Sequence, residues 1–187
     1  MSEDFKIPTM DEVMDGMNSL FGIIDLLDEN YKMYDHNYLM RHMKNRGLSL
    51  REVFLSDMLD WLCFLGWGDG NIDVSEVNFI NQLLHLNLTQ MDVFEVVKNL
   101  DAKRLTTLPI TFAIFIEYEA VSGNDMDVSI VEALYSLFFI TGSYLIVADG
   151  NVDDNEVLGL KAYMDSLRVN IDTFNLESIH DYMLDQI

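Results

Sequence analysis

The chain has 187 residues, half of them hydrophobic, and carries 11 lysines and arginines against 32 aspartates and glutamates, for a net charge of −21. The hydrophobic content is enough for a core, which excludes a disordered chain, and the acidic balance argues against binding of nucleic acid or anionic lipid, because both require Lys and Arg. The charge instead fits plain solubility, cation binding or docking to a basic protein partner.

The composition and the spacing of apolar residues predict helices throughout. Two prolines stand beside 12 methionines and many leucines, and proline breaks helices whereas Met and Leu favour them. The sequence shows no convincing alternating strand pattern. In chain order it predicts helices over residues 10–28, 35–46, 50–67, 74–86, 90–100, 109–121, 128–148, 154–167 and 175–186.

Four helix starts have the spacing of a capping box, in which the first side chain accepts from the N3 amide and a Glu three residues later reaches back. The pairs are Thr9 and Glu12, Ser49 and Glu52, Asp73 and Glu76, and Asp153 and Glu156. Gly47 and Gly123 are predicted to end helices. We expect a boundary near residues 45–49, between an N-terminal helical extension (1–48) and a helical domain (49–187).

Residues 133–148 form the longest uncharged stretch. It is shorter than the roughly 20 apolar residues of a spanning helix, so we expect no membrane span and a central buried helix in a soluble bundle. The acidic N-terminus does not resemble a secretory signal, which makes the cytoplasm the expected location. The single cysteine, Cys63, lies among apolar residues and is predicted to be buried.

A nine-residue motif occurs twice, eighty positions apart. Asp-Gly-Asn-Ile-Asp-Val-Ser-Glu-Val over residues 69–77 returns as Asp-Gly-Asn-Val-Asp-Asp-Asn-Glu-Val over 149–157, with six of nine positions identical. An apolar helix is predicted before each copy and an amphipathic helix after it. The sequence therefore predicts an all-α helical bundle built from two pseudo-symmetric helix-turn-helix repeats, around 50–100 and 128–187, plus the N-terminal extension.

The first interpretation of the motif is structural. A glycine adopts positive φ after one helix, an aspartate caps the next, a glutamate closes the capping box, and an apolar residue before the cap seals the turn. These roles fall to Gly70 and Gly150, Asp73 and Asp153, Glu76 and Glu156, and Ile72 and Val152, in that order.

The second interpretation is a site for a divalent cation, with Ca²⁺, Mg²⁺ or Mn²⁺ favoured by ligands that are all oxygen. An EF-hand is excluded, because the sixth loop position is Val74 or Asp154 rather than Gly and the twelfth is not Glu. The candidate ligands are Asp69, Asn71, Asp73 and Glu76 in the first copy and Asp149, Asn151, Asp153 and Glu156 in the second.

The stretch Ala148-Asp149-Gly150-Asn151-Val152-x-x-x-Glu156 resembles the small-Asp-Gly-x-Ile/Val-x-x-x-Glu motif of the tellurite-resistance TerB-like family. The first copy matches through Asp69, Gly70, Ile72 and Glu76, and the resemblance covers roughly residues 50–187. It implies an all-helical fold with two such motifs, an acidic metal-binding surface and a bacterial stress-response role. It implies no catalytic activity.

Other patterns point to packing rather than chemistry. Trp61, Phe64 and Trp67 recur at three-residue spacing, and core packing is the expected role unless Trp67 is exposed beside an acidic rim, where it would form a binding hot spot. The sequence contains no His-Glu-x-x-His, no cysteine pair and no Gly-rich phosphate loop. An enzyme is therefore not expected; it would require a buried carboxylate in a pocket, with a raised pKa.

Two functional hypotheses follow. The first is a non-enzymatic TerB-like binding protein of a bacterial stress-response or envelope-associated system, with a divalent cation at the repeated motifs. The alternative is an acidic inhibitor or immunity-type protein that neutralises a basic partner such as a nuclease toxin.

Overall fold

The computed structural model describes residues 8–30, 37–68, 70–122, 129–148, 150 and 152–178. Within these ranges the chain is all-helical and contains no strand, which confirms the predicted fold class. The helices are α1 (Met10–Glu29), α2 (Tyr38–Asn45), α3 (Leu50–Gly66), α4 (Val74–Leu84), α5 (Gln90–Asn99), α6 (Ala102–Thr106), α7 (Ile110–Ser122), α8 (Ile130–Leu145) and α9 (Asp154–Thr173), followed by the 3-10 turn η2 (Leu176–Ser178).

The helix predictions are wrong in three places. α6 was not predicted, and α9 ends at Thr173, well beyond the predicted residue 167, because no glycine or proline interrupts the chain after Leu167. The helix predicted over 175–186 begins instead as the turn η2, and its remainder lies outside the described residues. Gly47 has φ +78° just after α2, as predicted, whereas Gly123 is not described.

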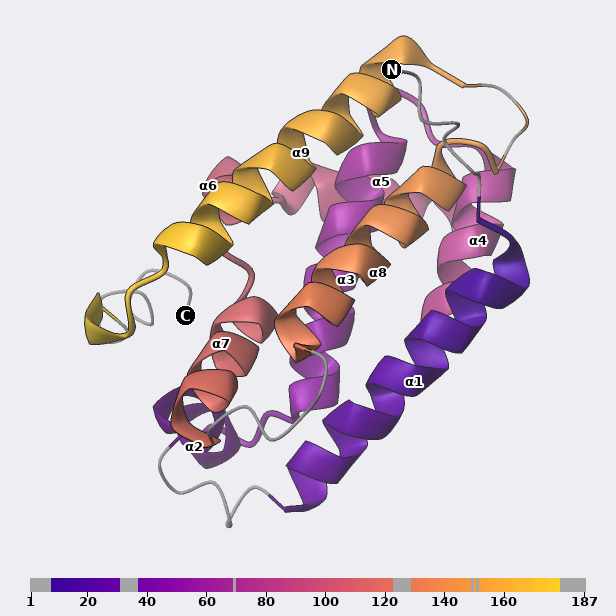
Figure 1. Cartoon of the computed structure of the whole chain (residues 1–187). Helices are drawn as coiled ribbons and strands as arrows, with labels where there is room; N and C mark the ends of the chain where they lie inside the picture. The colour runs from indigo at the N-terminus through magenta and orange to yellow at the C-terminus, as the bar shows by residue number, and fades with distance from the viewer. Residues whose placement is uncertain are drawn as a thin grey trace.

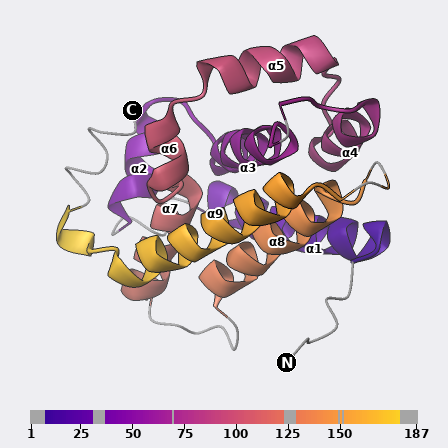
Figure 2. The ribbon, with the colours of Figure 1, turned by 90° about the horizontal axis from the view of Figure 1, so that it is seen from above.

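α3 and α8 form the centre of the molecule. α3 contacts α1, α4, α5, α7, α8 and α9, and α8 contacts α1, α3, α7 and α9. Figure 2 shows α5 as an outer layer on one side of α3 and α4, with α1, α8 and α9 on the opposite side. α1 shares the same buried core, and the predicted boundary near residue 48 stays a prediction.

The predicted aromatic packing is found where α3, α8 and α9 meet. Trp61 is 1 % exposed, stacks on Tyr163 with ring centroids 3.9 Å apart, and donates its indole N–H to the Phe138 carbonyl at 3.3 Å. Cys63 is also buried, as expected. Within the described ranges, no helix is both long enough and apolar enough to span a membrane. Figure 1 shows α8 running between α9 and α1 in front of α3.

Carboxylates of one helix cap the first turn of another at four places. Each accepts a hydrogen bond from a backbone N–H that has no partner within its own helix, so the acidic side chain is stabilised by the positive helix end. The pairs are Asp28 with Leu50 of α3, Asp57 with Thr111 of α7, Glu117 with Leu39 of α2, and Glu119 with Val131 of α8, at 2.8 to 3.1 Å.

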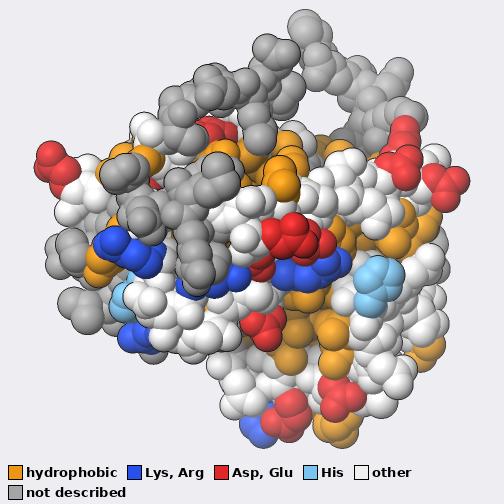
Figure 3. Space-filling model, turned by 90° about the horizontal axis from the view of Figure 1, so that it is seen from below, with side chains coloured by type: hydrophobic (Ala, Val, Ile, Leu, Met, Phe, Trp, Pro, Cys, Tyr) orange, Lys and Arg blue, Asp and Glu red, His pale blue; other side chains and the backbone are white. Residues whose placement is uncertain are grey.

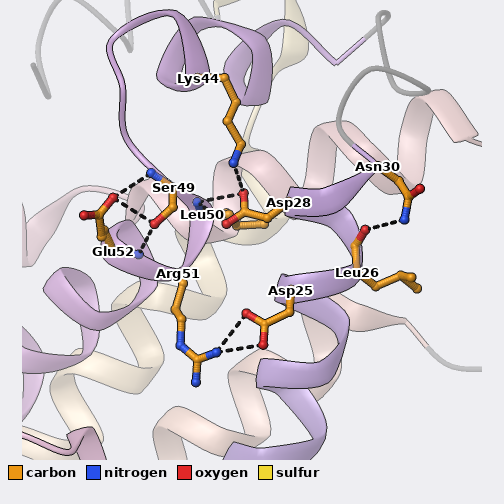
Figure 4. A network of polar contacts seen from close by, with 9 residues as sticks. All are labelled: Asp25, Leu26, Asp28, Asn30, Lys44, Ser49, Leu50, Arg51 and Glu52. Carbon is orange, nitrogen blue, oxygen red and sulfur yellow. Dashed lines mark hydrogen bonds and ion pairs between the residues drawn. The ribbon is translucent and has the colours of Figure 1, made fainter.

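Figure 4 shows the first of these caps in its surroundings. The Asp28 carboxylate accepts from the Leu50 N–H at 3.0 Å and pairs with Lys44 at 2.6 Å, while Arg51 pairs with Asp25 at 2.7 Å. Residues 41–51 hold four of the chain's lysines and arginines, and Figure 3 shows a face on which several blue Lys and Arg side chains lie among red Asp and Glu side chains. The acidic excess therefore belongs to the rest of the chain.

Candidate functional site

The first motif turn has the predicted capping geometry. Gly70 has φ +85°, and its N–H donates to the Trp67 carbonyl at 2.9 Å, which reverses the chain after α3. Asp73 and Glu76 form a capping box at the start of α4, in which Glu76 Oε2 accepts from the Asp73 N–H at 2.7 Å. Glu76 is buried. Three predicted motif residues thus take the structural roles expected of them.

α5 seals this first turn. Ile72 is 2 % exposed, and the Gln90 side-chain amide donates to its carbonyl at 2.6 Å. The Phe94 ring lies 5.5 Å from the Trp67 ring, centroid to centroid. Trp67 is therefore half-buried under α5 and is not the exposed hot spot considered from the sequence.

The second motif turn has a glycine of similar φ but different surroundings. Gly150 has φ +81°. Asp153 Oδ1 accepts from the Asn155 N–H at 2.7 Å, so the predicted bond to the N3 amide is wrong by one residue, because this carboxylate reaches the nearer N2 amide. Val152 is 55 % exposed, which contradicts the prediction that it seals the turn. No described helix covers Val152 as α5 covers Ile72.

The two copies lie close together at the end of α3. A Cβ atom placed on Gly66 would lie 3.3 Å from Glu76 Oε1, and one placed on Gly68 would lie 3.1 Å from Glu156 Cγ. Both glutamates are buried, so both pack against this short segment. The lack of a side chain at these two glycines allows the close approach.

The cation site stays a prediction. Asn71 donates to Asp73 Oδ1 at 3.4 Å, and among the residues that the structure describes no group of three or more His, Cys, Asp and Glu could hold a metal ion. Asp69, Asp149 and Asn151 lie outside the described residues. The structure therefore shows capping roles for part of the predicted ligand set.

A groove lies between α8 and α9, next to the second motif copy. It has a volume of about 460 Å³ and is lined almost entirely by apolar side chains, with Lys161 and Asp165 as the charged ones. Val152 lies at the motif end. At the opposite end, Arg168 of α9 pairs with Glu132 of α8 at 2.9 Å and lies over the Tyr135 ring. The main apolar lining residues are Tyr135, Phe139, Ile146, Val157, Leu160 and Met164.

Several groove residues are exposed although they are apolar. Phe139 is 38 % exposed and Val157 is 41 % exposed, beside the exposed Val152. Isolated exposed apolar residues are common, but a contiguous apolar hollow on a charged protein marks a binding surface. Helical periodicity did not predict this groove, because it indicates burial at every apolar position of the helix face, including Val157, which is exposed.

A buried carboxylate with a raised pKa lies elsewhere, between α3 and α7. Burial raises the pKa of Asp57 to about 6, although the N–H and hydroxyl of Thr111 donate to it at 2.9 and 2.7 Å and so oppose the shift. Asp60 pairs with Arg104 at 2.8 Å. The cavity beside these groups has a volume of about 10 Å³, room for about one water molecule. A buried carboxylate with a raised pKa is the feature that an enzyme would require. In this chain that carboxylate caps the first turn of α7.

Comparison with known proteins gives no match: no family model, no curated protein and no solved structure matches the chain. The resemblance of the motif to the TerB-like family stays a prediction.

Proposed function

We propose that the chain is a non-enzymatic binding protein that docks to a basic protein partner, in the manner of an acidic inhibitor or immunity-type protein. The observation that carries this proposal is the apolar groove between α8 and α9, on a chain of net charge −21. Apolar contacts supply affinity, and an acidic field speeds encounter with a basic partner and selects against acidic ones.

The acidic residues near the groove support this choice of partner. Residues 149–165 contain five acidic residues and one lysine. Asp154 and Asp165 are exposed on α9, where they can meet cations of a partner. The basic residues of α2 and the start of α3 are set apart in the sequence, over residues 41–51.

Two groups of the described chain that could react, the Asp57 carboxylate and the Cys63 thiol, have structural roles. This supports a binding role over a catalytic one. Asp57 caps α7 beside a cavity of about 10 Å³. Burial raises the pKa of the Cys63 thiol to about 12, so the thiolate that would act as a nucleophile is scarce at neutral pH.

Affinity capture at two salt concentrations tests the proposal. The tagged full chain is incubated with an extract of the cells that produce it, at about 0.05 M and about 0.5 M salt, because exposed charge interactions weaken with screening. We expect one basic protein to be retained at low salt and largely released at high salt. The variant Asp154→Asn/Asp165→Asn is expected to retain less of it, and the matched control is Asp11→Asn/Asp15→Asn, which neutralises two exposed aspartates of α1.

Retention of the same set of proteins by an unrelated protein of similar net charge would contradict the proposal. So would equal loss of capture in the two double variants, since charge alone, without a site near α9, would then explain the binding.

A TerB-like cation-binding protein of a bacterial stress-response or envelope-associated system is the second candidate. It is favoured by the packing of Glu76 and Glu156 against neighbouring glycines at the end of α3, which brings the two motif copies close together. Carboxylates gathered near helix ends are the ligand type that Ca²⁺, Mg²⁺ and Mn²⁺ prefer.

Thermal melting at fixed ionic strength tests this second candidate. A cation site held at a hundred times its Kd adds about 2.7 kcal/mol, or roughly 5–11 °C for a chain of this size. We expect a saturable rise for one of Ca²⁺, Mg²⁺ and Mn²⁺ that disappears in Asp69→Ala/Asp149→Ala. Equal rises for every ion would reflect screening of the net charge and would remove this candidate.

A further inference from the structure

The groove between α8 and α9 has a counterpart in the first repeat. α3 and α8 begin eighty residues apart, at Leu50 and Ile130, and α4 and α9 begin eighty residues apart, at Val74 and Asp154. Groove positions can therefore be matched by subtracting eighty. Val147, Val152 and Lys161 correspond to Trp67, Ile72 and Asn81.

α5 and the residues just before it contact all three of these counterparts. The Phe94 ring lies against Trp67, and the Gln90 amide donates to the Ile72 carbonyl. The Asn81 side chain accepts from the Leu88 N–H at 2.7 Å and donates to the Leu88 carbonyl at 2.8 Å. The first-repeat counterpart of the groove is thus filled from within the chain by an amphipathic helix of ten residues, whose Val93 is fully buried.

Among the described residues of the second repeat, no helix lies at the corresponding place. The stretch that corresponds to α5 by the same spacing is 170–179, and its described part continues α9 to Thr173 and then forms η2. Matched positions also differ in exposure. Val77 is 4 % exposed and Val157 is 41 % exposed. In the part of the chain that the structure describes, the apolar groove is thus covered in the first repeat and uncovered in the second.

The charge around the open groove indicates which charge a binding partner should carry. α5 carries Asp92, Glu95 and Lys98, which suits a contact inside one chain. A separate protein must approach a chain of net charge −21, and on α9 it meets the exposed Asp154 and Asp165 beside the single Lys161. An occupant with lysines or arginines along the edges of its apolar face would gain attraction where an acidic one would be repelled.

We propose that the groove between α8 and α9 binds an amphipathic helix of a partner protein, with apolar residues at i, i+3 and i+4 and basic residues along its edges. The bound helix occupies the place that α5 occupies in the first repeat. This inference rests on the proposed function for the existence of a basic protein partner, and it adds the site and the form of the contact.

Photo-crosslinking identifies the occupant directly. Benzoylphenylalanine replaces Val157 in the full chain, inside the cells that produce it, and the crosslinked peptide is identified by mass spectrometry. We expect a crosslink to one segment of another protein, with apolar residues at helical spacing and flanking Lys or Arg. The matched control places the same crosslinker at Leu158, the adjacent position, which is 64 % exposed and does not line the groove.

A peptide with the sequence of the crosslinked segment then measures affinity. Val152→Glu is expected to weaken its binding at least about tenfold, by placing a charge in an apolar contact. Leu158→Glu adds the same charge outside the groove and is expected to change binding by less than about twofold. Both residues are more than half exposed, so both variants are expected to fold.

A crosslink from position 157 to this chain, either to a second copy or to residues 179–187, would overturn the inference, as would equal crosslinking from positions 157 and 158. Salt-sensitive capture of a basic partner that Val152→Glu leaves unchanged would overturn the groove as the site while leaving the proposed function standing. Absence of any such partner for the unaltered chain would instead remove the proposed function.

Discussion

The turns at Gly70 and Gly150 have nearly the same backbone, with φ of +85° and +81°, yet their surroundings differ. Ile72 lies under α5 and is 2 % exposed, whereas its counterpart Val152 is 55 % exposed beside the open groove. The glutamates of both copies, Glu76 and Glu156, are buried. The shared motif thus accounts for the turn, while the segment that follows α4 or α9 decides whether the neighbouring groove is covered.

The two copies of the motif differ in the segment that follows α4 or α9. After the first copy, the chain reverses direction at the end of the short helix α4 and continues as α5, which lies over α3 and α4. In the second, α9 continues as one helix of 20 residues. Covering a groove adds stability, and leaving one open makes apolar surface available to a partner.

The largest expected effect is a difference in the free energy of unfolding between substitutions at Ile72 and at Val152. Ile72→Ala removes buried methyl groups and leaves a cavity, so we expect it to lower the free energy of unfolding by about 2–5 kcal/mol. Val152→Ala acts at an exposed position and is expected to change the free energy of unfolding by less than about 0.5 kcal/mol. Denaturant unfolding of the two variants measures both values, and equal losses would break the comparison.

A second prediction concerns Asp57, whose counterpart in α8 by the same spacing is the buried Leu137. The folded pKa of Asp57, about 6, is above the ordinary value, so the folded chain holds a proton there that the unfolded chain releases. The stability that Asp57 contributes is therefore full below the ordinary Asp pKa and is lost as the pH rises through 6. Between pH 5 and pH 7 this loss amounts to about 1 kcal/mol.

Asp57→Asn isolates this contribution, because its side-chain oxygen still accepts from Thr111 but does not titrate. Denaturant unfolding measures how far the free energy of unfolding falls from pH 5 to pH 7. We expect this fall to be about 1 kcal/mol smaller for the variant than for the unaltered chain. The unaltered chain also loses repulsion between its other carboxylates at low pH, and the subtraction cancels that effect. The same pH dependence in both proteins would contradict the raised pKa of Asp57.

A third prediction concerns an effect that the two copies share. Gly70→Ala and Gly150→Ala each force a side chain into positive φ, with open space around the new Cβ atom in both cases. We expect each substitution to cost about 1–2 kcal/mol, and the two costs to agree within about 0.5 kcal/mol. Thermal melting compares them; a clear difference would show that the turns are not equivalent.

The sequence predicted the local features well because their determinants are local. The capping boxes at Thr9, Ser49 and Asp73 and the positive φ of Gly70 depend on residues within a few positions. The exposure of Val152 depends instead on whether a distant helix covers it. The cap that Asp57 provides joins residues 54 positions apart, and a spacing rule for single helices does not contain that information.

The same limit applies to the candidate site. Periodicity marks Val157 and Leu160 as one apolar helix face, and such a face is found equally in a core and in an open groove. The motif residues were visible because they repeat. The groove is a feature of the folded chain, because it forms only where α8 and α9 pack against each other.

Thiol labelling at matched positions tests the central claim, that one groove is covered and the other is open. Val77→Cys and Val157→Cys are compared in the full chain, where the native Cys63 is silent because it is buried and its thiol pKa is raised to about 12. We expect Val157→Cys to react at least about a hundredfold faster, since Val77 is 4 % exposed and its labelling requires the packed structure around it to open locally. Similar rates at the two positions would contradict the account.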